Sequence, residues 1–497
     1  MNLRRTIPAV RQAGLVLAVA WAAFHWGGVA PVDFYPVLLG LILLFLLSLA
    51  DGLAVEWWGW LLLAPLVPMA FNGSLPSFAL HYVAFWIVVV LAAHSKTTVP
   101  GCPATPNERS WSGGSGMGVV WGLLALGIVE ALLGLSRALL HFAGQDLALF
   151  PMGTIFNRNH FAGFLEMLVP LCFALGAAAW RVGAEAGRTG GRENGWTGGR
   201  VAGRTGGRED GWPGERVAGR MAGREDGWPG GRGARRAPQG PPVLPSSGSL
   251  VLGSSRPPVL AFSGSPALQA ARAHALGRAW LFFLAGGVLF LAILFSLSRG
   301  GTVSAVVGTA TAGALVWAQS RRAAAGAAGQ GRALAAGIGI LVVVGALWIG
   351  IQPVVERFVQ IDRDAVGRTW IFGHTAHMIA DHPLLGVGAG MHGWVFTRYQ
   401  EVNPDIFYDY AHNDYLQGAA DWGLPAALVF FGIVFFLVWR AARACVTSYD
   451  PARVALLAGC LGGVAAILCH SFSDFNLQIP SNAMLFGVLL GKAAGRA

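Results

Sequence analysis

Long apolar runs separated by short polar segments dominate the pattern of this chain. A run of about 17–25 mostly apolar residues is long enough to cross the hydrocarbon core of a bilayer as an α-helix. The pattern therefore predicts an all-α fold, a polytopic transmembrane helical bundle of about twelve spans. The windows lie at residues 10–30, 33–50, 54–71, 77–94, 117–140, 160–180, 277–297, 301–318, 333–351, 424–440, 453–470 and 481–494.

Composition agrees with a membrane protein. Hydrophobic residues make up 54% of the chain and charged residues 12%, whereas soluble domains carry about 25% charged residues. The first apolar window is flanked by Arg4, Arg5 and Arg11, and no small-residue cleavage site ends it. A secretory signal peptide would end at such a site, so we expect this window to be a retained helix.

Basic residues fall on alternate connections between the windows. The turns near 31–35, 72–77 and 471–480 contain no Lys or Arg. Cytoplasmic loops carry an excess of Lys and Arg, so both termini are predicted to be cytoplasmic. The net charge of +10 is then a topology signal, with anionic inner-leaflet lipid as its counter-charge and no nucleic-acid partner. The basic residues of the inner segments are Arg4, Arg5, Lys96, Arg109, the arginine-rich stretch after Arg181, Arg321, Arg322, Arg332, Arg440, Arg443, Lys492 and Arg496.

The cysteines indicate no disulfide framework. All of them fall in expected inner segments or inside spans, and none matches a zinc-site spacing. We interpret them as small apolar core residues. They are Cys102, Cys172, Cys445, Cys460 and Cys469.

A polar insert at 181–276 interrupts the membrane pattern. A six-residue Gly-Arg-Glu-Asx-Gly-Trp unit starts at residues 191, 207 and 223, and a Pro/Ser-rich stretch follows it. Such units bury no apolar face, so the insert is predicted to be a disordered cytoplasmic linker. The alternative is an electrostatic tether to anionic lipid. The remaining organisation is expected to be spans one to six in 1–180, spans seven to nine in 277–351, a periplasmic loop in 352–423 and spans ten to twelve in 424–497.

The outer loop 352–423 mixes aromatic, charged and apolar residues. An amphipathic helix is expected from Gly367 to Asp381, closed by His382-Pro383 and by the glycine-rich turn 386–390. A second helix is expected from Met391 to Tyr399.

The predicted topology places four polar clusters on the outer side. Arg299 lies in a short turn, where a cation at membrane depth costs several kcal/mol. It either snorkels to headgroups or binds a phosphate or pyrophosphate bidentately. We favour the second interpretation because Arg158, Arg363 and Arg368 are expected to face the same region. The clusters are Asn157-Arg158-Asn159-His160, Ser298-Arg299, the loop 352–423, and the segment from His470 to Asp474.

The segment 410–417 reads Tyr-Ala-His-Asn-Asp-Tyr-Leu-Gln and places His412, Asn413 and Asp414 beside a predicted span. A histidine at that boundary lies where water-soluble and lipid-bound reactants meet. Histidine can exchange a proton near neutral pH, which suits it to act as a general base.

Five segments, in this order, resemble motifs of the bacterial O-antigen ligase and polymerase family of membrane sugar transferases. The similarity runs from about residue 150 to the C-terminus, without the insert. The segments are 153–167 with Asn157-Arg158-Asn159-His160, the turn Ser298-Arg299-Gly300-Gly301, the stretch from Arg368 to Gly388, the pair His412-Asn413, and 470–480.

This resemblance implies transfer of a glycan from undecaprenyl pyrophosphate to an acceptor hydroxyl at the periplasmic face of the bacterial inner membrane. Lipid A-core, another glycan or a protein is the implied acceptor. Such a donor is already activated and needs no cofactor, and no nucleotide-binding signature is found. We expect a metal-independent, inverting displacement with His412 as base, oriented by Asn413 or Asp414. Arg299 and Arg368 would stabilise the departing pyrophosphate.

Several alternatives stay open. His374 and His377, near Asp381 and His382, have a spacing that allows a metal site. His160 and His470 suit structural hydrogen bonds at helix ends. Glu166 suits pairing with an arginine or lining a lipid groove, and Asp474 suits acceptor contact or holding an arginine. At the level of function, the alternatives are a polymerase of lipid-linked repeat units, a membrane transporter, and a structural scaffold.

Overall fold

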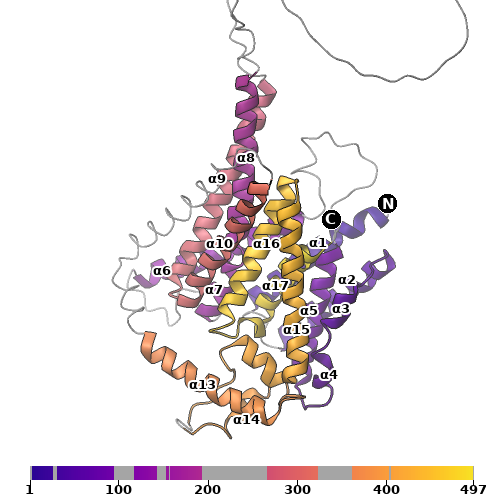
Figure 1. Ribbon diagram of the computed structural model, residues 1–497, viewed down its shortest axis with the longest axis vertical. Helices are drawn as coiled ribbons and strands as arrows, with labels where there is room; N and C mark the ends of the chain where they lie inside the picture. Colours follow the sequence, from indigo (N-terminus) through magenta and orange to yellow (C-terminus); the bar gives the residue numbers. More distant parts are fainter. Residues whose placement is uncertain are drawn as a thin grey trace, which may run out of the picture. The chain divides into compact units, whose positions relative to one another are not determined.

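The computed structural model describes residues 3–25, 31–94, 117–142, 153–155, 157–192, 266–322, 361–401 and 405–495. All regular elements in these segments are helices, which confirms the all-α prediction (Figure 1). The chain divides into one compact unit of residues 1–187 with 267–497 and a second of 188–266. Most of the second unit lies outside the described residues.

Eight of the described helices are long and apolar enough to cross a membrane, which confirms a multi-pass protein. The elements are α1 (Leu3–Phe24), α2 (Pro31–Ala50), α3 (Trp57–Leu61), α4 (Leu66–Met69), α5 (Pro76–His94), α6 (Met117–Phe142), α7 (Arg158–Glu166), α8 (Val169–Arg192), α9 (Pro266–Phe295), α10 (Arg299–Arg322), α13 (Ile361–Asp381), α14 (His392–Phe396), α15 (Asp414–Thr447), α16 (Pro451–His470), the 3₁₀ turn Asn476–Gln478 and α17 (Pro480–Ala494).

The predicted window 54–71 is not one helix. Pro65 has no N–H group to bond to the carbonyl of Leu61, which instead accepts from the amide of Ala64 at 3.1 Å. The segment therefore folds as α3, a turn and α4. α17 spans 15 residues, and the window 333–351 lies outside the described residues. Eight candidate spans are thus described where the sequence predicts twelve.

The helices that flank the insert continue beyond its expected boundaries. α8 runs to Arg192 instead of stopping near residue 180, and α9 begins at Pro266 instead of residue 277. Apolar content marks where a helix can lie in a membrane, but a helix continues into polar sequence until a residue ends it. The repeat units beyond residue 192 lie outside the described part of the chain.

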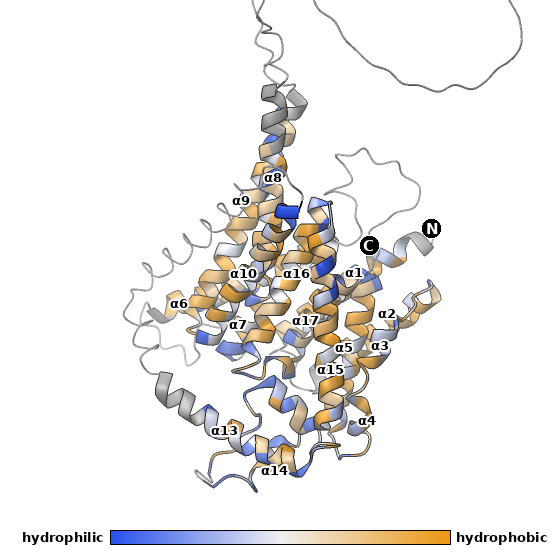
Figure 2. Ribbon diagram, viewed as in Figure 1, coloured by the Kyte–Doolittle hydropathy of each residue, from blue (hydrophilic) through white to orange (hydrophobic). Residues whose placement is uncertain are grey.

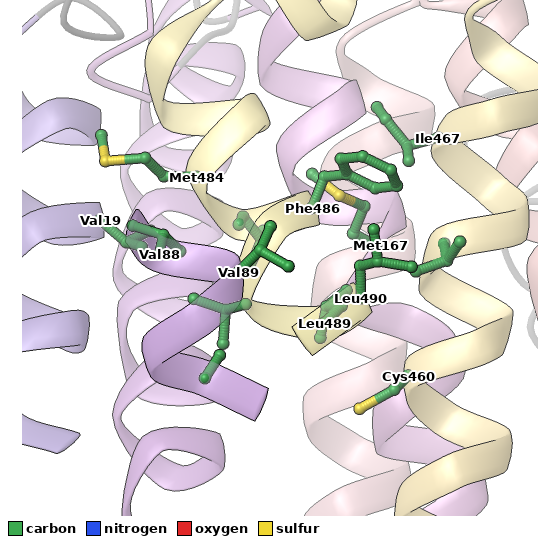
Figure 3. Packing of buried hydrophobic residues seen from close by; sticks show 14 of the residues in the cluster. Val19, Val88, Val89, Met167, Cys460, Ile467, Met484, Phe486, Leu489 and Leu490 are labelled. Atoms are coloured by element: carbon green, nitrogen blue, oxygen red, sulfur yellow. The ribbon is translucent and has the colours of Figure 1, made fainter. Parts of the chain in front are cut away.

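The core forms where α17 packs between α5 and α16. Figure 3 shows Leu489 and Leu490 of α17 between Val89 of α5 and Cys460 of α16. Small residues allow neighbouring membrane helices to approach closely. A Cβ atom on Gly462 of α16 would lie 2.6 Å from the carbonyl oxygen of Gly308 in α10. Close packing of this kind fixes the helix ends that carry the polar clusters.

Hydrogen bonds hold the segment 382–391 against the helical bundle. The side-chain amide of Asn72 donates to the carbonyl oxygens of Leu385 at 2.6 Å and Asp421 at 2.8 Å. Its glycines adopt positive φ angles, 71° at Gly386 and 105° at Gly388, which explains the glycine-rich turn. α14 follows and ends at Phe396, earlier than the predicted end at Tyr399.

α15 begins ten residues before the predicted span at 424. Gly423 interrupts its helical geometry with a φ of 78°, and there the amide of Leu424 donates to the carbonyl oxygen of Pro383 at 2.8 Å. The predicted loop 352–423 therefore ends in a helical segment that continues into the long apolar part of α15. α13 and α14 lie at the end of the bundle where α15 begins (Figure 1), and polar residues gather around that end (Figure 2).

Candidate active site

The backbone around His412 is held by the first turn of α15. Asn413 caps this helix, because its side-chain oxygen accepts from the amides of Tyr415 and Leu416, each at 3.0 Å. The amide of Ala411 donates to the side-chain oxygen of Gln417 at 2.8 Å. His412 itself has a φ of 52°, in the left-handed region that non-glycine residues rarely adopt. Such strain persists only where the surroundings fix it, so the direction of the imidazole is set locally.

His412 lies beside a buried carboxylate. Its Nδ1 atom is 3.4 Å from Oδ1 of Asp474. The side chain of His412 is 33% exposed, and that of Asp474 is 2% exposed. The Phe475 ring meets the imidazole edge-on at 5.0 Å. One face of the imidazole is therefore packed against protein while the ring still reaches solvent.

Asp474 also contacts the start of α7. Its Oδ2 atom accepts from the side-chain amide of Asn159 at 2.8 Å, and its Oδ1 atom lies 3.9 Å from Nε2 of His160. Burial raises the pKa of Asp474, but the hydrogen bond with His412 and the electrostatic interactions with the neighbouring histidines lower it by more. The pKa is therefore held well below its usual range, and the carboxylate is ionised at neutral pH.

A second buried pair lies behind the arginine turn. Nδ1 of His470 is 2.9 Å from Oε2 of Glu166, and both side chains are at most 2% exposed. A Cβ atom on Gly300 would lie 2.5 Å from Nε2 of His470. The turn that carries Arg299 thus packs directly against this pair, which fixes where α10 begins.

The predicted anion-binding arginines come from three elements. Arg158 and Arg299 are the first residues of α7 and α10, and each is partly exposed. Arg368 on α13 is partly buried, and its charge acts on His470. Arg363 also lies on α13, but its side chain is outside the described part of the structure. Arg299 therefore precedes the glycine that packs against His470, and the charge of Arg368 acts on the same histidine.

A family comparison agrees with this geometry. Residues 280–431, less than a third of the chain, match the family model described as O-antigen ligase. The chain carries an O-antigen ligase domain. Ligases and polymerases share this family, and the match implies a membrane enzyme that transfers glycans. No curated protein sequence matches the chain.

The matched O-antigen ligase domain contains Arg299, Arg368 and His412. The two carboxylates of the site, Glu166 and Asp474, lie outside the matched residues. Glu166 is the last residue of α7, and Asp474 follows α16 and contacts His412 of the domain directly. The sequence segments 153–167 and 470–480 therefore contribute carboxylates that lie beside histidines of the candidate site.

The expected orienting role of Asn413 or Asp414 differs from the arrangement found. Asn413 is occupied as a helix cap, and its amide donates to the carbonyl oxygen of Phe472 at 3.1 Å. Asp414 accepts from the hydroxyl of Ser471 at 2.8 Å and from the amide of Leu477 at 3.1 Å. Both residues hold the segment 471–477 against α15. The carboxylate beside His412 is Asp474, for which the sequence suggested acceptor contact or a contact with an arginine.

The remaining predicted residues have structural contacts. Asn157 caps α7 by accepting from the amide of Asn159 at 2.8 Å. Glu166, for which pairing with an arginine and lining a lipid groove were both open, pairs with His470. On α13, the rings of His374 and His377 are 6.1 Å apart. Within the described segments, no three His, Cys, Asp or Glu side chains gather in a group that could hold a metal ion.

Proposed function

We propose that the protein transfers a glycan from undecaprenyl pyrophosphate to a hydroxyl group of an acceptor such as lipid A-core, at the periplasmic face of the inner membrane. The contact between His412 and Asp474 carries this proposal, because it combines a partly exposed imidazole with a buried, ionised carboxylate. A carboxylate that accepts from one ring nitrogen leaves the other nitrogen as the proton acceptor.

The reaction follows from that arrangement. Asp474 accepts the Nδ1–H of His412, and Nε2 takes the proton of the acceptor hydroxyl. The acceptor oxygen bonds to the anomeric carbon of the donor sugar as the bond from that carbon to the pyrophosphate oxygen breaks. The electron pair leaves with undecaprenyl pyrophosphate, and the proton stays on His412 until solvent removes it. A single displacement inverts the anomeric centre and needs no metal ion.

Arg299 and Arg368 bind the pyrophosphate in this proposal. Negative charge develops on the departing oxygen, and a guanidinium placed there stabilises the transition state more than the ground state. The relation of both arginines to His470 supports a shared anion site. Arg158 and Arg363 are the next candidates for contact with the donor.

We also propose twelve spans with both termini in the cytoplasm. Residues from α7, the start of α10, the start of α15 and the end of α16 meet at one end of the bundle. Arg440 of α15 contacts the carbonyl of Ala494 near the end of α17, at the other end. Arg321 and Arg322 also lie at that end, where Gln319 donates to the carbonyl oxygen of Ser448 at 3.0 Å. This separation agrees with the positive-inside rule.

The test is the size distribution of lipid-linked glycans in the native host, compared between the wild type and His412→Ala. Long polymers retained on the carrier, with loss of the surface glycan, are the result expected of a ligase. Single repeat units retained on the carrier identify a polymerase instead. Unchanged carrier and surface pools would contradict a catalytic role for His412 and favour a transporter or scaffold.

A further inference from the structure

Two leucines project from the turn that follows α13. Leu384 is 71% exposed, and the neighbouring Leu385 is exposed as well. Exposed apolar side chains are normal when they are scattered, but a contiguous group of them marks a surface that contacts an apolar partner. The leucines belong to the segment expected to be a loop in water. Their neighbours in space therefore decide whether they form such a surface.

The backbone holds both leucines in this position. On one side of them, the amide of Leu424 donates to the carbonyl oxygen of Pro383 at 2.8 Å. On the other side, the amide of Val387 donates to the carbonyl oxygen of Ala420 at 2.7 Å. A Cβ atom on Gly386 would lie 2.5 Å from that same carbonyl oxygen, so the turn lies directly against α15. The leucines cannot turn inward without the loss of these hydrogen bonds.

The turn adjoins the lipid-facing side of a membrane span. Leu424 and Leu428 lie four residues apart on α15, on the same side of the helix. Both are exposed, Leu428 by 71%. α15 is one of the helices long and apolar enough to cross a membrane, so its exposed leucines face lipid. Because Leu424 bonds to Pro383, the exposed leucines of the turn begin where this side of α15 begins.

A third segment extends the same surface. Phe71 follows α4 and is 76% exposed. The side chain of the next residue, Asn72, donates to the carbonyl oxygen of Leu385 at 2.6 Å. Leu75 is exposed too, and its amide donates to the carbonyl oxygen of Ala389 at 3.0 Å. Three segments thus contribute exposed, uncharged, apolar side chains. We call this set the apolar rim; it consists of Phe71, Leu75, Leu384, Leu385, Leu424 and Leu428.

We propose that the turn 382–386 enters the adjoining leaflet of the bilayer, where the apolar rim contacts phospholipid acyl chains. Lipid is the occupant that the geometry favours, because the rim continues the lipid-facing side of α15. The exposed polar residues Asp381 and His382 directly precede the leucines, as suits a chain that passes from the headgroups into the apolar region. The end of α13, the helix that carries Arg368, is thereby anchored at the membrane surface.

The experiment uses the full-length protein without its native cysteines, with Leu384→Cys carrying an environment-sensitive fluorescent label. The protein is reconstituted in phosphatidylcholine liposomes that contain phosphatidylcholine with a quenching nitroxide near its glycerol backbone. Leu428→Cys, within the span, is the reference for lipid contact. Gly373→Cys is the matched control, an exposed position on α13 where a Cβ atom meets nothing within 4 Å. We expect quenching at Leu384 to equal that at Leu428 and to exceed that at Gly373 several times.

Leu385→Cys is an independent second position, and its label should be quenched in the same way. Quenching at both leucines no greater than at Gly373 would overturn the proposal. Disulfide-linked dimers of the unlabelled Leu384→Cys protein, together with absent quenching, would assign the apolar rim to a second copy of the chain instead of lipid. None of these measurements depends on glycan transfer, so failure of the proposed function and failure of this proposal are distinguishable.

Discussion

His412 and Asp474 are 62 residues apart in the sequence, yet Nδ1 of the first lies 3.4 Å from Oδ1 of the second. The imidazole belongs to the loop before α15, and the carboxylate belongs to the segment after α16. Because the carboxylate is buried and the imidazole is not, the pair has one solvent-facing partner that can meet a substrate. Asp474, the buried partner, can only position His412.

Asp474→Asn should lower the turnover number for glycan transfer about a hundredfold, because the base loses the carboxylate that orients it. The Michaelis constant for the donor should stay near the wild-type value, since Asp474 has no access to substrate. Steady-state kinetics of the purified protein separate these two quantities. Asp381→Asn is the control; this exposed carboxylate accepts from the Tyr399 hydroxyl at 2.8 Å and should not affect turnover. A changed Michaelis constant with unchanged turnover would contradict the positioning role.

Gly300→Ala should reduce activity through the arginine turn. A Cβ atom there would lie 2.5 Å from Nε2 of His470, so the imidazole or the start of α10 must move. We expect at least a tenfold loss of transfer, since small displacements of positioned groups are costly to catalysis. Gly277→Ala meets nothing within 4 Å and should retain activity, with a stability gain of about 0.5–1 kcal/mol from helix propensity. Equal activity of the two variants would show that the turn tolerates the shift.

The apolar windows predicted most helices because the thickness of a bilayer fixes the length of a span. The break between α3 and α4 carried a visible signal, Pro65 and Pro68, which hydropathy alone does not register. The pairing of His470 with Glu166 had no such signal, because these residues are 304 positions apart. Only tertiary packing brings them together.

The same limit applies to the candidate site. Its residue types could be found because polar clusters stand out between apolar runs, and His412 and the arginines were chosen on that basis. Proximity in the sequence favours Asn413 and Asp414 as partners of His412. Instead, Asn413 caps α15, and Asp414 accepts a hydrogen bond from the hydroxyl of Ser471. Nearness in sequence at a helix start favours capping over contact with the preceding side chain.

Low pH should decrease the stability of the segment around α14. Burial lowers the pKa of His392 to about 4, although its hydrogen bond to the carbonyl of Tyr408 favours the charged form. An unfolded histidine titrates near pH 6.5, so between these values the folded state binds fewer protons. Stability is therefore fully present above pH 6.5 or so and decreases toward pH 4, by at most about 3 kcal/mol.

Hydrogen-exchange protection factors for residues 392–401, measured at pH 7.5 and pH 5, test this expectation. The wild type should lose protection at the lower pH, and His392→Gln should show little pH dependence. His382→Gln removes an exposed histidine just after α13 and should behave as the wild type. Persistent loss of protection in His392→Gln would assign the effect to another group.

Cysteine labelling tests the proposed orientation. In a background without native cysteines, Arg398→Cys, at an exposed position just after α14, should react with a membrane-impermeant maleimide in intact spheroplasts. Arg321→Cys, exposed at the end of α10, should react only after the membrane is opened. The opposite labelling pattern would place the His412 site in the cytoplasm, where a periplasmic transfer reaction is impossible.

The most direct test reconstitutes the purified protein in liposomes and supplies extracted lipid-linked glycan and acceptor. The quantity measured is the rate at which undecaprenyl pyrophosphate is released. His412→Ala should lower this rate by about a hundredfold or more, the usual effect of removing a general base. His382→Ala changes an exposed histidine just after α13 and should leave the release rate unchanged. A His412→Ala rate within about threefold of the wild type, well below the usual effect of losing a base, would contradict the proposed chemistry.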